Sequence, residues 1–308
     1  MTNGKYEITC RAVLAGLGAA GLGLGLRTAR AAEPALSRVF PKTNEPVPAI
    51  GMGSWISFNV GDDEDLRAAR AEVLRAFFAG GGALIDSSPM YGSSQEVIGD
   101  CLKRLGRPKA FAATKVWHAF QGAGIEQMAE ARALWGVAQF DLMQVHNLLA
   151  WESHLETLIK DKAEGRVRYI GLTTSHGSRH EEMEEIMRGR AEIDAVQFTY
   201  NILDREAEER LLPLAAEKGL AVVINRPFRR GALFDHVKGR ALPGWAGEIG
   251  AASWAQVFLK FVLAHPAVTC AIPATSNVAH MVENMAALKG PLPDAAMRQR
   301  MIKDVEGL

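Results

Sequence analysis

The chain has 308 residues, with 35 basic and 35 acidic side chains and 48% hydrophobic residues. This composition is typical of a globular protein with enough apolar material for one large core. The balanced charge gives no support to nucleic acid or another highly charged surface as a partner.

Residues 1–31 differ in composition from the rest of the chain. Lys5 and Arg11 precede an uncharged run of glycine, alanine and leucine from 12 to 26, and the small residues of Ala29-Arg30-Ala31 follow. A basic start, a short apolar run and a small-x-small cleavage pattern are typical of an export signal. The run is too short and too rich in glycine to favour a transmembrane helix.

The stretch Thr9-Cys10-Arg11-Ala12 resembles a twin-arginine signal in which Cys10 replaces one arginine. We therefore predict an export signal over 1–31, a linker over 32–40 and a single barrel domain over 41–308. The protein is then expected outside the cytoplasmic membrane, in the periplasm, with the export machinery of the twin-arginine route as a transient partner.

The cysteines beyond the signal, Cys101 and Cys270, lie far apart, one in an expected helix and one in an expected strand. Two buried free thiols are expected rather than a disulfide, and the sequence shows no metal-ligand spacing.

Strand and helix patterns alternate after the short strand that ends in Gly51-Met52-Gly53-Ser54-Trp55. The helices are expected over 65–79, 95–105, 124–135, 152–164, 179–188, 206–218, 251–264 and 278–289. The later strands are expected over 83–86, 110–115, 140–146, 167–173, 194–198, 220–225 and 268–272. This alternation indicates an α/β fold with a parallel sheet. Eight units in roughly 270 residues fit a (β/α)₈ TIM barrel, for which ~250 residues are typical.

A doubly wound open sheet is the alternative fold. It would require a G-x-G-x-x-G turn after the first strand, whereas Gly80-Gly81-Gly82 precedes a strand. The connection from Arg229 to Gly250 exceeds the usual length and is a candidate lid or pocket wall.

Polar side chains lie at the C-terminal ends of several expected strands, which is where a (β/α)₈ barrel has its active site. Asp86, Lys115, His146 and Gln197 end the second, third, fourth and sixth strands, and Tyr91 follows Asp86 by five residues. Each alone could be an ordinary strand-end residue, but titratable groups on three successive strands indicate a site. A buried Lys115 would need Asp86 as its partner.

These residue types suit the reduction of a carbonyl group. A tyrosine hydroxyl has a pKa near ~10, and the ammonium of Lys115 would favour the phenolate and lower the pKa of Tyr91. Tyr91 could then protonate a carbonyl oxygen that neutral His146 orients by a hydrogen bond. The hydride must come from a cofactor, because no side chain carries one.

The motifs Asp86-x₄-Tyr91-Gly92, Thr114-Lys115 and Val145-His146-Asn147 resemble, in order and position, the catalytic tetrad motifs of the aldo-keto reductases. Residues 164–172 look like the fifth-strand signature of that family, and Ile272-Pro273-Ala274-Thr275 looks like part of its C-terminal cofactor motif. The resemblance implies a (β/α)₈ barrel that reduces a small aldehyde or ketone with NADP(H) or NAD(H). It also implies a catalytic role for Tyr91, Asp86, Lys115 and His146.

The same resemblance implies a set of cofactor contacts. Gln197 matches the residue that holds the nicotinamide carboxamide, and Arg226 could supply the flat surface that an aromatic residue often offers. Ala274 and His280 stand where Lys and Arg usually meet the adenosine 2′-phosphate, which weakens the usual preference for NADP. The full set is Thr173, Thr174, Gln197, Arg226, Pro227, Phe228, Ala274, Thr275, His280, Glu283 and Asn284.

Trp55 and Trp117 follow strand ends and are candidates for the wall of the substrate pocket, although ordinary aromatic positions explain them equally well. Two other functions remain open. One is a cofactor-binding regulatory or scaffold barrel with vestigial catalysis, and the other is a barrel enzyme that uses Lys115 as a Schiff-base nucleophile.

Overall fold

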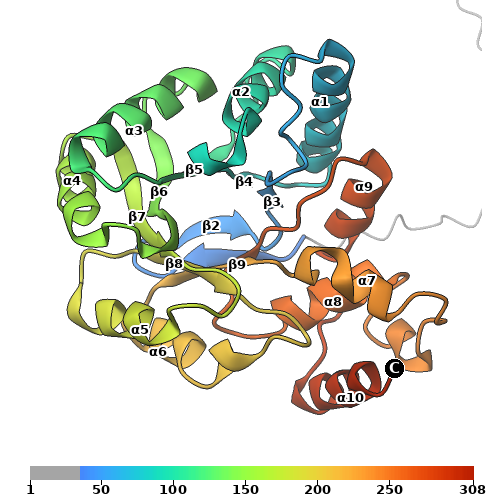
Figure 1. Cartoon of the computed structure of the whole chain (residues 1–308). Helices are drawn as coiled ribbons and strands as arrows, with labels where there is room; N and C mark the ends of the chain where they lie inside the picture. The colour runs from blue at the N-terminus through green and yellow to red at the C-terminus, as the bar shows by residue number, and fades with distance from the viewer. Residues whose placement is uncertain (1–34) are drawn as a thin grey trace, which may run out of the picture. The chain divides into compact units, whose positions relative to one another are not determined.

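The protein forms a barrel of eight parallel strands, as a computed structural model shows for residues 35–308. The predicted export signal lies outside these described residues. The sheet follows the chain in order from β3 to β10, and Figure 1 shows helices around its strands. Backbone bridges from Ile50 to Ala271 and from Gly53 to Ala274 join the two ends of the sheet. The predicted (β/α)₈ TIM barrel is therefore confirmed. Its strands are β3 (Met52–Gly53), β4 (Leu84–Asp86), β5 (Phe111–Val116), β6 (Phe140–Val145), β7 (Val167–Thr173), β8 (Ala195–Thr199), β9 (Ala221–Asn225) and β10 (Cys270–Ala271).

Helices cover the outer face of the strands, and the interior of the barrel buries the inner face. Because both faces are buried, the strands are nearly continuous apolar runs in the sequence. All six residues of β5 are buried, for example. The helices are α1 (Glu64–Ala79), α2 (Ser94–Arg104), α3 (Gln121–Trp135), α4 (Trp151–Ala163), α5 (His180–Gly189), α6 (Leu211–Lys218), α7 (Ala232–His236), α8 (Trp254–Leu263), α9 (Val278–Ala286) and α10 (Ala295–Glu306).

An antiparallel hairpin of β1 (Ser37–Phe40) and β2 (Glu45–Pro48) closes the barrel at the N-terminal ends of its strands. Phe40 packs against Phe111 and Tyr169, with ring centroids 5.1 and 4.5 Å apart. Glu45 pairs with Arg168 at the start of β7. β1 therefore occupies residues that the sequence assigned to a linker over 32–40.

Three further segments differ from the expected elements. The connection from 229 to 250 is not one open loop, because it contains the short 3₁₀ helices η4 (Arg229–Gly231) and η5 (Gly244–Gly247) and the helix α7. The helix expected over 206–218 is divided into η3 (Glu206–Glu208) and α6. The sequence patterns also missed α10.

Cys101 and Cys270 are buried free thiols, as expected. Within residues 35–308, no helix combines the length and the apolar character needed to cross a membrane.

Candidate active site

Asp86 is the centre of a buried hydrogen-bond network at the C-terminal end of β4. One carboxylate oxygen, Oδ2, lies 2.5 Å from Nζ of Lys115 on the neighbouring strand β5. The other, Oδ1, accepts hydrogen bonds from the amide nitrogens of Gln144 at 2.9 Å and Gln197 at 3.0 Å. Asp86 is only 2% exposed, so these donors replace the water that a carboxylate otherwise needs.

Lys115 is fully buried and also donates to the backbone carbonyl of Ser87 at 2.8 Å. Burial opposes the charged form of Lys115, but Asp86 and Tyr91 outweigh burial and raise the pKa of the ammonium. Lys115 therefore keeps its charge, and the expected pairing with Asp86 is confirmed.

Tyr91 ends the 3₁₀ helix η1 (Pro89–Tyr91), which directly follows β4. The Nζ atom of Lys115 lies 5.1 Å from the centre of its ring. Burial raises the pKa of the Tyr91 hydroxyl, and the neighbouring ammonium of Lys115 offsets only part of that rise. Lys115 therefore lowers the pKa of Tyr91 as expected, but burial outweighs it and the pKa is raised overall. The phenol holds its proton at neutral pH, which is the form that a proton donor requires.

His146 directly follows β6 and faces Tyr91 edge-on, with ring centroids 5.8 Å apart at an angle of 87°. Its side chain is buried, and burial together with the charge of Lys115 lowers the pKa of the imidazole to about 3. His146 is therefore neutral across the physiological pH range. It can donate one hydrogen bond to a polar atom in the cavity.

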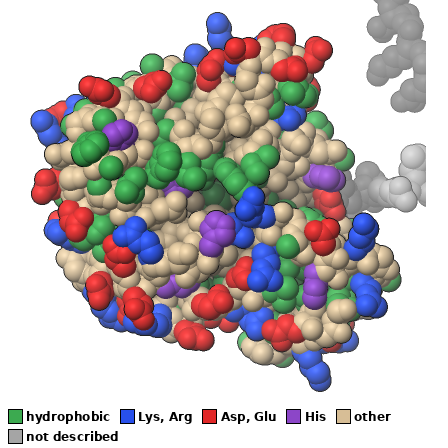
Figure 2. Space-filling view, viewed as in Figure 1, with side chains coloured by type: hydrophobic (Ala, Val, Ile, Leu, Met, Phe, Trp, Pro, Cys, Tyr) green, Lys and Arg blue, Asp and Glu red, His purple; other side chains and the backbone are tan. Residues whose placement is uncertain are grey.

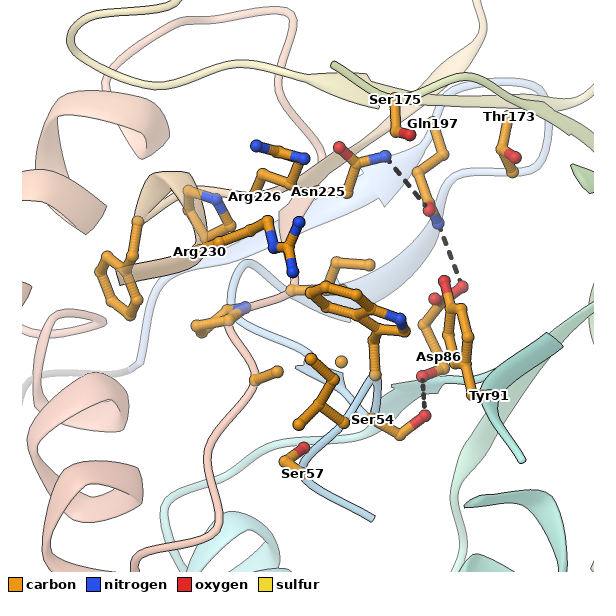
Figure 3. A pocket seen from close by; sticks show the side chains of 18 of the residues that line it. Ser54, Ser57, Asp86, Tyr91, Thr173, Ser175, Gln197, Asn225, Arg226 and Arg230 are labelled. Atoms are coloured by element: carbon orange, nitrogen blue, oxygen red, sulfur yellow. Dashed lines mark hydrogen bonds between the residues drawn. The ribbon is translucent and has the colours of Figure 1, made fainter. Parts of the chain in front are cut away.

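A cavity of about 770 Å³ opens above this network, a size that suits a small-molecule or cofactor site. On the face that Figure 2 shows, a central hollow has hydrophobic, Lys or Arg, and His side chains around it. In Figure 3, Gln197 lies between Asn225 and Asp86 and is joined to both by hydrogen bonds. The predicted residues that line the cavity are Trp55, Asp86, Tyr91, His146, Thr173, Thr174, Gln197, Arg226, Pro227, Phe228, Ala274 and Thr275.

Five predicted residues do not line this cavity. Lys115 lies beneath it, and Trp117 follows β5 outside the lining. His280, Glu283 and Asn284 are on α9, also outside the lining, so their cofactor contacts stay predictions.

The connection after β9 supplies part of the cavity wall, as expected, through Arg230, Gly231 and Phe234. The guanidinium of Arg230 lies 4.2 Å from the ring centre of Trp55, which follows β3. The sequence patterns missed Arg230, because no spacing rule connects it with a tryptophan 175 positions earlier. They also missed Ser88, whose hydroxyl lies 2.8 Å from Nδ1 of His146.

Three polar atoms of the lining are buried without a hydrogen-bond partner among the described residues. They are Oγ of Ser57, Oγ1 of Thr174 and Nε of Arg226. Buried polar atoms are almost always paired, so a ligand with oxygen acceptors and polar hydrogens would complete this wall.

Comparison with known proteins identifies a family and several relatives. The model of the aldo/keto reductase family matches residues 49–303. The NADH-specific methylglyoxal reductase of Escherichia coli K12 is 27% identical over 241 residues, which cover 66% of this chain and 71% of that protein. Aldo-keto reductase YhdN of Bacillus subtilis is 29% identical over 203 residues, which cover 60% of this chain and 59% of that protein.

Solved structures agree with this relationship. An aldo/keto reductase from Klebsiella pneumoniae, in complex with NADP and acetate, superposes with a TM-score of 0.73 at 25% identity, over 87% of this chain and 94% of that one. Because the family model matches most of the chain and the solved structure shares its fold, the chain belongs to the aldo/keto reductase family.

Proposed function

We propose that Tyr91 protonates the oxygen of a small aldehyde or ketone in this cavity. The protein is an NAD(P)H-dependent oxidoreductase, as its family and its relatives among the reductases indicate. One observation carries the assignment of the proton donor. A protonated tyrosine and a neutral histidine face each other in the cavity, directly above a buried Lys115–Asp86 ion pair.

The wall of the cavity suits a nicotinamide cofactor. Oγ1 of Thr174 and Nε of Arg226 need partners, and a dinucleotide offers them phosphate, hydroxyl and amide groups. Arg226 and Arg230 add positive charge for the phosphates. The amide nitrogen of Gln197 donates to Asp86 and Gln144, and its oxygen, which accepts a long hydrogen bond of 3.5 Å from Asn225, has a second lone pair to accept from a carboxamide. When bound, the reduced nicotinamide supplies the hydride that the side chains lack.

Each side chain of the site has a separate role in the reduction of the substrate. His146 donates a hydrogen bond to the carbonyl oxygen and orients it. The Tyr91 hydroxyl gives its proton to that oxygen, and the adjacent ammonium of Lys115 stabilises the phenolate that forms. Asp86 holds Lys115 in place and balances its charge.

Tyr91→Phe tests the assignment, because it removes the hydroxyl and keeps the ring. We expect carbonyl reduction with NADPH to fall by about 10²–10⁴-fold, the usual contribution of a general acid, while NADPH binding, followed by fluorescence, is unchanged. Turnover within a few-fold of the unaltered protein would refute the role of Tyr91.

Two assays separate the other two functions. A scaffold barrel would bind NADPH and reduce none of a panel of carbonyl compounds. A Schiff-base enzyme would form a borohydride-trapped adduct at Lys115, but this lysine is fully buried and ion-paired, which disfavours nucleophilic attack.

We also propose that residues 1–31 direct export of the folded, cofactor-loaded protein by the twin-arginine route. The support is their basic, apolar and small-residue pattern and the advantage of folding where nicotinamide cofactors are made. Cell fractionation with N-terminal sequencing should find a chain that begins near Ala32 outside the cytoplasmic membrane, and Arg11→Gln should leave the precursor in the cytosol. Full-length protein in the cytosol of unaltered cells would contradict export.

A further inference from the structure

Ser88 is a fully buried residue of the site that lies two positions after Asp86, where it caps η1. Its hydroxyl oxygen accepts a hydrogen bond from the backbone N–H of Met90 at 3.2 Å. The same hydroxyl lies 2.8 Å from Nδ1 of His146. Within residues 35–308, these are the hydrogen-bond partners of the Ser88 hydroxyl.

The direction of the contact with His146 follows from an account of the available protons. A serine hydroxyl has one hydrogen to donate. The Met90 N–H is itself a donor, so it cannot receive that hydrogen. Nδ1 of His146 is the remaining partner, and a buried hydroxyl that donates to nothing is unfavourable. The Ser88 hydroxyl therefore donates, and Nδ1 of His146 accepts.

The charge around His146 agrees with this direction. Burial and the ammonium of Lys115 hold the pKa of the imidazole at about 3, so the ring carries a single N–H. If Nδ1 accepts a hydrogen bond, that N–H must be at Nε2.

We propose that Ser88 is a positioning residue that fixes His146 in its Nε2–H tautomer, so that the N–H is presented to the substrate oxygen. This inference rests on the proposed carbonyl reduction and adds to it the residue that makes His146 a donor rather than an acceptor. With Nδ1 protonated instead, a bare Nε2 lone pair would repel a carbonyl oxygen.

The neighbouring serines show that this contact is specific to Ser88. The hydroxyl of Ser87 turns away from His146 and joins Ser54 at 2.9 Å and Ser94 at 3.2 Å. Ser94 is equally buried and close in sequence, but its hydroxyl is bonded to Ser87 and to the backbone carbonyl of Ser54, and it does not line the cavity. Ser94→Ala is therefore a matched control for the loss of one buried hydroxyl.

The direct test is the protonation state of the two ring nitrogens of His146, measured by ¹⁵N NMR on the full chain without substrate. His146→Gln identifies the signals among the eight histidines. We expect an unprotonated Nδ1 and a protonated Nε2 in the unaltered protein, in Ser88→Thr and in Ser94→Ala. In Ser88→Ala we expect signals averaged between the two tautomers. A protonated Nδ1 in the unaltered protein, or an unchanged tautomer in Ser88→Ala, would overturn the proposal.

Steady-state kinetics give a second measurement. Loss of one hydrogen bond that orients the imidazole should lower kcat/KM for a carbonyl substrate about five- to tenfold in Ser88→Ala. Ser88→Thr should restore it, because threonine keeps both the cap and the donor, and Ser94→Ala should change it little. Restored activity without the Nε2–H tautomer would also count against the proposal. If the unaltered protein reduced no carbonyl, the proposed function would fail while the NMR result stood independently.

Discussion

At the scale of single residues, the Lys115–Asp86 pair allows stability and catalysis to be measured separately. Lys115→Met leaves a buried carboxylate without its cation, and we expect the free energy of unfolding to fall by about 3–5 kcal/mol. Asp86→Asn combined with Lys115→Met removes both charges and should recover most of that loss, as measured by urea unfolding.

Carbonyl reduction should remain lost in both variants, because neither has a cation to stabilise the Tyr91 phenolate. Activity of the double variant close to that of the unaltered protein would show that Lys115 has a structural role alone.

His146 should make the stability of the protein depend on pH. Its folded-state pKa is about 3, below the usual value near ~6.5 of an unfolded histidine. As the pH falls from 6.5 toward 3, the unfolded chain takes up a proton that the folded one does not, so this stability is full above pH 6.5 and is lost below it. The loss approaches about 1.4 kcal/mol per pH unit.

We expect the free energy of unfolding to fall less steeply between pH 6 and pH 4.5 in His146→Gln than in the unaltered protein. Urea titrations at several pH values measure both slopes. Equal slopes would mean that folded His146 also takes up a proton in this range.

The main site residues could be predicted from the sequence because each of them follows a strand pattern. Asp86, Lys115 and His146 are polar residues at the ends of apolar runs, and a barrel brings such ends together. Ser88 could not be predicted, because serines are common after strands and its partner lies 58 residues away. The overall rise in the pKa of Tyr91 could not be predicted, because the cost of burial depends on the packing around η1, which the spacing does not reveal.

At the scale of elements, Gly99 on α2 fixes how closely α2 approaches α3. A Cβ at Gly99 would lie 1.8 Å from the backbone oxygen of Leu134, so alanine there would force the helices apart. We expect Gly99→Ala to lower the free energy of unfolding by about 1–3 kcal/mol or more.

Gly122→Ala on α3 is the matched control, because nothing lies within 4 Å of the Cβ that it would add. Alanine should stabilise that helix by about 0.5–1 kcal/mol. Thermal unfolding of the two variants measures both effects, and a destabilisation equal in size at the two sites would contradict the argument from close approach.

The helices and strands of the barrel were predictable because hydrophobic patterns with periods near 3.6, and short apolar runs, identify them. The exceptions have local causes. Pro213 lacks an N–H and is tolerated only in the first turn of a helix, so α6 begins at Leu211 rather than at 206. Proline is rare in strands, so Pro46 and Pro48 made β2 difficult to predict from the sequence. The prolines are tolerated in β2 because both strands of the hairpin are edge strands.

At the scale of the whole molecule, the hairpin packing lies at the end of the barrel opposite the cavity. Phe40 lies in the hairpin at the N-terminal end, where it packs on Phe111 and Tyr169, and none of the three lines the cavity. Phe40→Ala should therefore cost about 3–5 kcal/mol of unfolding free energy and leave kcat/KM nearly unchanged under native conditions. A large fall in kcat/KM, with the protein still fully folded, would show that the two ends are coupled.

The closure of the barrel also bears on how a newly synthesised chain avoids aggregation. Gly53 and Ala274 meet across the seam, so the sheet stays open at both edges until nearly the whole chain has left the ribosome. Open edges invite pairing with another molecule. Once all eight strands are present, the edges on either side of the open seam are β3 and β10, which contain only two residues each, so they offer a second chain few backbone groups. We therefore expect a barrel whose seam has not yet closed to be a poor template for intermolecular sheets.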